Sequence, residues 1–142
     1  MAEAGLDVLG VESNLVGGEC PYWGCIPSKM MIRTGNLLAE ARLMPDMAGS
    51  AHIEPGFAPV AARIRAEATD NWDDKVAVER FVVKGGRFVR GRGRLVGPGT
   101  VLIEPADSQG ESVRIAARRG VVVATGTQPS APPIPGLAKT PY

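Results

Sequence analysis

The protein has 142 residues, of which 44% are hydrophobic and 22% are charged, which suits one globular domain with one core. Its formal net charge of +1 gives no general electrostatic basis for binding nucleic acid or an anionic membrane. The apolar runs are too short to cross a bilayer and the N-terminus lacks the pattern of a signal peptide, so we expect a cytoplasmic protein.

The first predicted elements are the end of a helix and a strand. Residues 2–4 are expected to close a helix, because Gly5 is typical of a helix C-cap. Residues 6–12 alternate loosely between apolar and polar side chains, which predicts a strand that ends at the carboxylate of Glu12.

Two helices are predicted next. The glycine pair at 17–18 interrupts the chain, and a proline and a serine then open a helix over residues 27–43. Residues 45–59 contain glycine and proline and are expected to form a loop. Helical spacing of apolar residues predicts a second helix over residues 60–83, where Trp72 would pack between this helix and a sheet.

Beyond a second glycine pair the apolar period changes to two, which predicts a β-meander and one further strand. The last strand is apolar throughout, as is typical of a strand that is covered on both faces. A proline-rich extended connector follows it. The predicted strands are residues 87–96, 100–104, 112–117 and 120–124, and the connector is residues 127–142.

Three arginines on the first strand of the meander raise the question of a phosphate-binding strip. Arg90, Arg92 and Arg94 alternate and therefore share one face. Because acidic residues balance them and no aromatic side chains lie between them, a solvated face is the favoured interpretation. His52, in the predicted loop, is expected to be a surface residue.

The cysteines carry the clearest chemical signal. Cys20 and Cys25 are five positions apart, and in a reducing compartment such a pair indicates metal or redox chemistry. A closed zinc site needs four ligands, and the cysteines with His52 supply only three, so metal is the weaker option.

The surroundings of the pair favour redox chemistry over two buried thiols without a role. The cysteines can be bridged if the backbone turns between them, because their Cα atoms must come within about 7 Å. Cys25 would stand at a helix start and Lys29 adds a cation, and both features favour the reactive thiolate form of a cysteine.

The segment GGECPYWGCIPSK, residues 17–29, resembles the active-site motif of the class I pyridine nucleotide–disulfide oxidoreductases. This group includes dihydrolipoamide dehydrogenase, glutathione reductase and mercuric reductase. A second segment, VVVATG at residues 121–126, resembles the second flavin-domain signature of the group, and the proline-rich stretch after it resembles the exit towards an NAD(P)-binding domain. The resemblance covers nearly the whole chain.

The resemblance implies an α/β fold. Residues 1–126 would form a partial Rossmann-like FAD-binding domain with an inserted antiparallel β-meander, and residues 127–142 would lead towards an NAD(P)-binding domain. In a dinucleotide fold the glycine loop precedes the ribose-binding acid by about 20 residues. Only eleven residues precede Glu12 and the sequence contains no G-x-G-x-x-G, so we expect the first strand and the glycine loop to be missing from these 142 residues.

The resemblance also implies roles for single residues. Cys25 would face the flavin as the charge-transfer thiolate, and Cys20 would be the interchange thiol that attacks substrate. Lys29 would lie near the flavin N5, and Glu12 would bind the adenosine ribose. Backbone close to the cofactor would come from Gly17, Gly18, Ala124, Thr125 and Gly126.

The implied activity is that of a flavin-dependent disulfide oxidoreductase, an enzyme active as a homodimer. Electrons would pass between NAD(P)H, FAD, the Cys20–Cys25 disulfide and a small-molecule disulfide, dithiol or metal-ion substrate. The alternative is a truncated, non-catalytic fragment or binding module without bound flavin. The residues between the cysteines, PYWG, differ from those of the best-known members, which leaves the substrate open.

Overall fold

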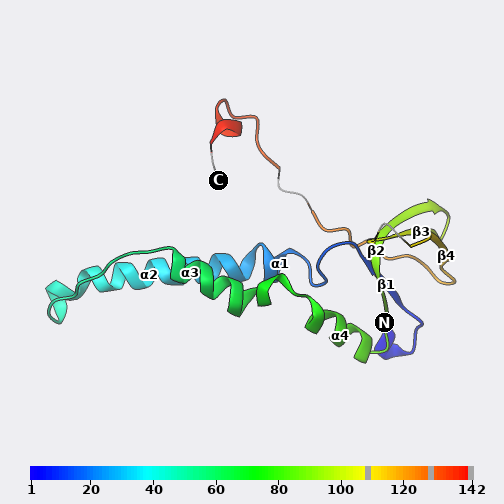
Figure 1. Ribbon diagram of the computed structural model, residues 1–142, viewed down its shortest axis with the longest axis horizontal. Coiled ribbons are helices and arrows are strands. Elements are labelled where there is room, and N and C mark those ends of the chain that lie inside the picture. The colour runs from blue at the N-terminus through cyan, green and yellow to red at the C-terminus, as the bar shows by residue number, and fades with distance from the viewer. Residues whose placement is uncertain (108–109, 128–129, 141–142) are drawn as a thin grey trace.

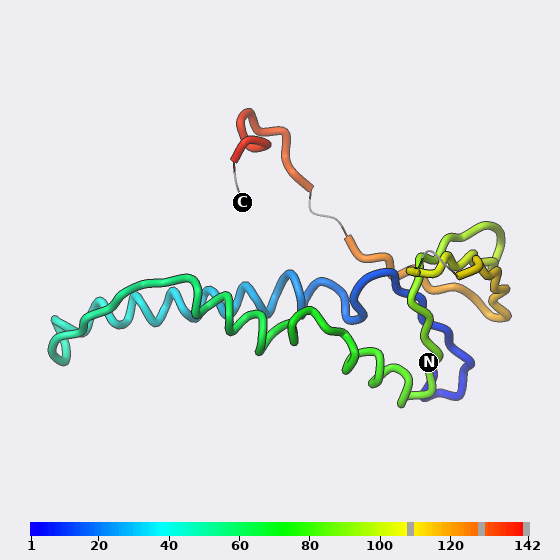
Figure 2. The backbone as a smooth tube through the Cα atoms, viewed as in Figure 1, coloured from blue at the N-terminus to red at the C-terminus, as the bar shows by residue number. Residues whose placement is uncertain are grey.

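The computed structural model describes residues 1–107, 110–127 and 130–140, and it shows an elongated molecule with a helical arm at one end and a small sheet at the other (Figure 1). The long helix α2 forms most of the arm, and the chain returns beside it through α3 and α4 to reach the sheet. The tube in Figure 2 shows that the C-terminal part of the chain leaves the sheet end and runs away from the sheet and from the helical arm.

The N-terminal elements agree with the predicted ones. A 3-10 turn, η1 (Ala2–Ala4), ends at Gly5, whose φ of 80° is the left-handed conformation of a C-cap glycine. Strand β1 (Leu9–Glu12) lies within the predicted strand and ends at the predicted carboxylate. A short helix, α1 (Glu19–Tyr22), and then α2 (Cys25–Met47) follow. Helix α2 is longer than predicted at both ends, and Pro45 lies inside it.

The prediction of one continuous helix over residues 60–83 is wrong. The segment consists of α3 (Ala58–Arg63), a π-helical turn η2 (Ile64–Ala68), a 3-10 turn η3 (Asp70–Trp72) and α4 (Lys75–Val83). Thr69 caps η3 with its hydroxyl, which accepts a hydrogen bond from the Trp72 N–H. Asp, Asn and Thr side chains compete for backbone hydrogen bonds, so this stretch breaks the helix in spite of its apolar spacing.

The sheet has four strands in the order β1-β2-β3-β4. Strand β1 pairs in parallel with β2 (Arg87–Gly97), which is followed by antiparallel β3 (Thr100–Pro105) and β4 (Val113–Ala116). The predicted meander is therefore confirmed, and the parallel pair makes the arrangement mixed α/β. Residues 108–109, between β3 and β4 in the sequence, lie outside the described residues.

The predicted strand at residues 120–124 is not formed. These residues pair with no strand in the described part of the chain, and Val122 and Val123 are 69% and 64% exposed. A strand needs a neighbour for its N–H and C=O groups, and apolarity alone does not provide one. The connector continues without regular structure from residue 130 to a 3-10 turn, η4 (Leu137–Lys139); residues 128–129 and 141–142 are outside the described part.

The packed interior is small. Val60 and Ile64 are buried where α3 and η2 contact α2, and Ile103 is buried on strand β3 of the sheet. The accessible surface is 11212 Å², against about 7,000 Å² for a folded monomer of this mass. Much of the apolar surface, including parts of α2, is therefore open to solvent. Among the described residues, no helix combines the length and apolarity needed to cross a membrane.

Candidate redox site

The turn that carries the cysteines begins with two glycines in conformations that other residues rarely adopt. Gly17 has a φ of 121°, and Gly18, with φ 72° and ψ −161°, precedes α1. The N–H groups of Trp23 and Gly24 both donate to the carbonyl of Glu19 at 2.8 Å, which closes the turn. Helix α2 then begins at Cys25, the first residue after the cap.

Tyr22 anchors this turn to the loop after β1. The ring is buried, with 7% of the residue exposed, and its hydroxyl donates to the carbonyl of Val16 at 3.1 Å. Burial raises the pKa of Tyr22, and the nearby carboxylates of Asp74 and Asp73 raise it further. The hydroxyl therefore remains a proton donor throughout the physiological range.

Cys20 and Cys25 are exposed, free thiols whose side chains interact. The hydrogen bond between the two side chains is the main reason why the pKa of the Cys20 thiol is raised above its ordinary value. Desolvation and the charge of Cys25 act in the same direction, while the Cys25 backbone N–H and the Lys29 ammonium lower the pKa by less. Cys20 thus keeps its proton more firmly than an isolated cysteine does.

The carboxylate of Asp74 connects three segments beside this turn. It accepts a hydrogen bond from the Val16 N–H at 2.6 Å and two from Arg90 Nη2, at 2.8 and 2.6 Å. Burial raises the pKa of Asp74, but the hydrogen bonds from Arg90 and Val16 outweigh that effect, so the pKa is lowered overall. The loop that enters the glycine pair is therefore fixed to the start of α4 and to β2.

This arrangement corrects the sequence interpretation of Arg90. Arg92 and Arg94 lie on the solvated part of β2, as expected, and Arg94 pairs with Glu104 at 3.4 Å. Arg90 is instead half-buried, with 33% of its side chain exposed, and lies 4.9 Å from the Phe88 ring centroid. The alternation of arginines gave no sign of the difference, because the partner of Arg90 is 16 residues away.

The structure also changes the expected role of Trp72. Its ring packs on Trp23, which lies between the two cysteines, with the ring centroids 5.6 Å apart. The expected packing between helix and sheet is made by Phe81 of α4 instead, since a Cβ added at Gly10 of β1 would meet its ring at 3.0 Å. His52 is a surface residue, with 89% of its side chain exposed.

The predicted cofactor-binding residues are only partly brought together. Glu12 lies at the end of β1 and accepts a hydrogen bond from the Asn14 N–H at 2.8 Å, at the start of the loop that leads to the cysteines. The residues from Gly17 to Lys29 form one continuous turn and helix start. The remaining three, Ala124, Thr125 and Gly126, are exposed on the segment that forms no strand.

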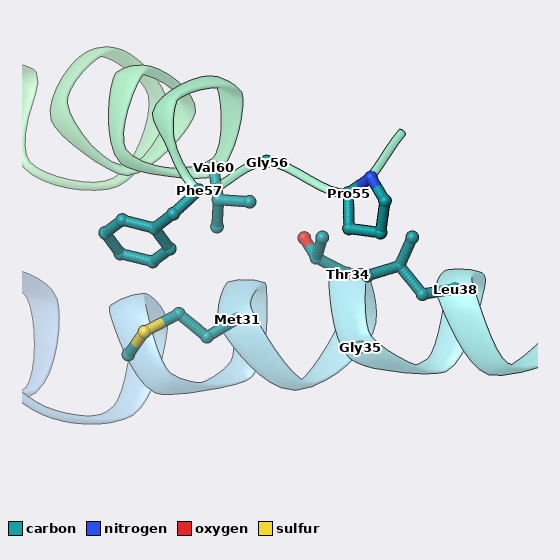
Figure 3. A pocket seen from close by; sticks show the side chains of 8 residues that line it. All are labelled: Met31, Thr34, Gly35, Leu38, Pro55, Gly56, Phe57 and Val60. Atoms are coloured by element: carbon teal, nitrogen blue, oxygen red, sulfur yellow. The ribbon is translucent and has the colours of Figure 1, made fainter. Parts of the chain in front are cut away.

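A hollow of about 350 Å³ lies elsewhere, between α2 and the start of α3 (Figure 3). Figure 3 shows Met31 of α2 opposite Phe57 and Leu38 of α2 opposite Pro55. Its lining holds no titratable side chain, so it is a packing gap between helices rather than a place for redox chemistry. Within the described ranges no three His, Cys, Asp or Glu side chains are close enough to hold a metal ion.

A family profile described as pyridine nucleotide-disulphide oxidoreductase matches residues 1–142, the whole chain. The chain belongs to the pyridine nucleotide-disulphide oxidoreductase family. Members of this family are FAD-dependent disulfide oxidoreductases that use NAD(P)H. The paired cysteines in their glycine-led turn are the part of this structure that suits such chemistry.

Relatives within the family include two kinds of enzyme. The chain is 32% identical over 143 residues to a mercuric reductase of Acidithiobacillus ferrooxidans, covering 99% of this chain and 25% of that protein. It is 33% identical over 148 residues to a dihydrolipoyl dehydrogenase of Bacillus subtilis (strain 168), covering 96% of this chain and 29% of that protein. The chain therefore spans between a quarter and a third of the length of these relatives.

A solved structure supports the fold. The crystal structure of LpdA from Mycobacterium tuberculosis matches with a TM-score of 0.59 and 21% identity, covering 76% of this chain and 24% of that one. The mixed α/β arrangement thus corresponds to part of a larger family fold.

Proposed function

We propose that this chain supplies the redox-active dithiol and part of the FAD-binding surface of a flavin-dependent disulfide oxidoreductase. The observation that carries the proposal is the placement of two exposed thiols, Cys20 and Cys25, in one short turn that is led by glycines with positive φ and closed by hydrogen bonds to the carbonyl of Glu19. Thiols held in one tight turn can form an intramolecular disulfide if their Cα atoms lie within about 7 Å.

The proposed chemistry is thiol–disulfide exchange. The thiolate of Cys20 attacks a substrate disulfide, forming a mixed disulfide and releasing one substrate thiolate, which takes a proton from solvent. Cys25 then attacks the Cys20 sulfur of the mixed disulfide and displaces the second substrate thiol. The products are the Cys20–Cys25 disulfide and two substrate thiols, so two electrons have passed to the substrate.

The residues present offer FAD a partial site. Gly18 and Gly126 have open space where a Cβ would stand, which allows a cofactor to approach their backbone, and Glu12 provides a carboxylate for a ribose hydroxyl. When bound, FAD would carry electrons between NAD(P)H and the disulfide. The role of this chain's residues is to hold the thiols in reach and, through Lys29, to place a positive charge beside them.

The substrate class is part of the same proposal. The relatives are named for mercuric ion and for dihydrolipoyl groups, so a dithiol, a disulfide or a thiophilic metal ion is the substrate class proposed here. Two exposed thiols suit each of these, because a thiolate is both a nucleophile towards sulfur and a soft metal ligand.

The deciding experiment is to treat the reduced chain with oxidised glutathione and to count protein thiols and bound glutathione by mass spectrometry. The proposal predicts that both thiols are lost together, with no glutathione retained. The Cys20→Ser and Cys25→Ser variants should each retain one glutathione, because the second thiol is then missing. Stable mixed disulfides on the unmodified chain would overturn the proposal.

A further inference from the structure

The only two tryptophans of the chain are paired although they are 49 positions apart. Trp23 and Trp72 have ring centroids 5.6 Å apart and ring planes inclined by 32°, within the range of favourable aromatic pairs. Trp23 is 58% exposed and lies between the two cysteines, whereas Trp72 belongs to the turn η3 in the interrupted second helix.

The backbone that presents Trp72 is strained. Asp70, Asn71 and Trp72 have φ values of 48°, 57° and 58°, and three consecutive residues other than glycine in this region are unfavourable. Such strain persists only where the surroundings enforce it, and it often marks a functional position.

Contacts on both sides of the turn hold it in place. Thr69 is 1% exposed; its hydroxyl donates to the carbonyl of Arg65 at 2.9 Å and accepts from the Trp72 N–H at 3.4 Å. The guanidinium of Arg65 lies 6.0 Å from the centroid of the Trp72 ring. These contacts hold the Trp72 ring in position independently of its contact with Trp23.

We propose that Trp72 is a positioning residue for the Cys20–Cys25 pair. By stacking on Trp23 it holds the turn between the cysteines in its closed form, so less conformational freedom is lost when the sulfur–sulfur bond forms. The aromatic contact therefore favours the disulfide over the dithiol. This inference rests on the redox function proposed above.

The test is the redox equilibrium of the 142-residue chain with glutathione under anaerobic conditions. One oxidised glutathione accepts two electrons from the dithiol and yields two reduced glutathiones and the protein disulfide. We expect Trp72→Ala to lower the equilibrium constant for disulfide formation about tenfold, which makes the potential less negative by about 30 mV. Trp72→Phe, which keeps an aromatic contact, should change it by less than about threefold.

The single variant Trp23→Ala keeps the test decisive if Trp72→Ala does not fold. Trp23→Ala removes the same contact from the exposed side and should give the same tenfold loss, and the double variant should lose no more than either single one. Asn71→Gly relieves one left-handed residue without touching a ring and should leave the equilibrium constant unchanged.

The results separate the two proposals. An unchanged equilibrium constant in Trp23→Ala or in folded Trp72→Ala would overturn the positioning role while leaving the redox pair intact. Equal losses in Trp72→Phe and Trp72→Ala would also overturn it, because an aromatic ring at position 72 would then not preserve the equilibrium constant. If the unmodified chain forms no intramolecular disulfide with glutathione, the redox function and this inference both fail.

Discussion

Asp74 holds Arg90 through two hydrogen bonds to the same guanidinium nitrogen, at 2.8 and 2.6 Å, while one of its oxygens also accepts the N–H of Val16. These partners are 16 and 58 positions away along the chain. A single carboxylate therefore ties the loop before the cysteines to the sheet. Because both charged side chains are at least partly buried, removing one leaves the other poorly solvated.

Asp74→Asn should lower the free energy of unfolding by about 2–3 kcal/mol, because Arg90 would lose its counter-charge. Urea denaturation followed by circular dichroism measures this. The matched control is Glu104→Gln, which breaks the exposed 3.4 Å pair with Arg94 and should cost less than about 1 kcal/mol. Equal losses in the two variants would contradict a special role for the Asp74 pair.

The same carboxylate should make stability depend on acid. The pKa of Asp74 is lower in the folded chain than the value of about 3.9 for an unfolded aspartate. Its stabilising contribution is therefore complete above that ordinary value and is lost as the pH falls through the folded-state pKa. Urea midpoints between about pH 6 and about pH 3 should fall more steeply for the native chain than for Asp74→Asn; parallel curves would refute this.

Alkylation of Cys20 should need a higher pH than alkylation of an ordinary cysteine. The hydrogen bond with Cys25 raises the pKa of the Cys20 thiol, so its thiolate, the reactive form, appears later as the pH rises. Rates of carbamidomethylation, resolved by peptide mass spectrometry, give the midpoint. In Cys25→Ser the midpoint should fall, because the main cause of the shift has been weakened. A midpoint that does not move would show that the side chains do not interact in solution.

Gly18→Ala should destabilise the turn before the cysteines by about 1–2 kcal/mol. No atom stands within 4 Å of the added Cβ, so the cost comes from φ 72° and ψ −161°, a region that is almost restricted to glycine. Gly35→Ala is the matched control: it also has open space, but it lies within α2, where alanine should stabilise by up to about 1 kcal/mol. If both variants shift the midpoint temperature of thermal unfolding in the same direction, this account is contradicted.

The 142-residue chain by itself should bind FAD more weakly than micromolar. A dinucleotide fold holds the pyrophosphate with a glycine loop at a helix N-terminus, and the sequence contains no G-x-G-x-x-G. The ribose contact expected of Glu12 contributes on the order of 1.5–3 kcal/mol, against about 8 kcal/mol for a micromolar complex. Fluorescence titration of FAD measures the affinity, and a sub-micromolar dissociation constant would contradict the prediction.

The local features of the candidate site follow from the sequence alone. The two cysteines, the glycine pair and the start of α2 occupy fewer than ten consecutive positions from Gly17 to Cys25, so their proximity depends on short-range geometry. The meander was equally predictable, because alternation and glycine turns act between neighbouring strands. The same residues carry the resemblance to the family.

Which distant groups come into contact depends on the three-dimensional fold. The break after Ala68, the pairing of Trp72 with Trp23, and the half-buried position of Arg90 each depend on partners outside the local window. The apolar run at residues 120–124 shows the converse: its composition suits a buried strand, but no described neighbour pairs with it. Backbone and charged groups take the conformation in which their hydrogen bonds are satisfied. A local sequence pattern does not indicate where a partner 16 or 58 residues away will lie.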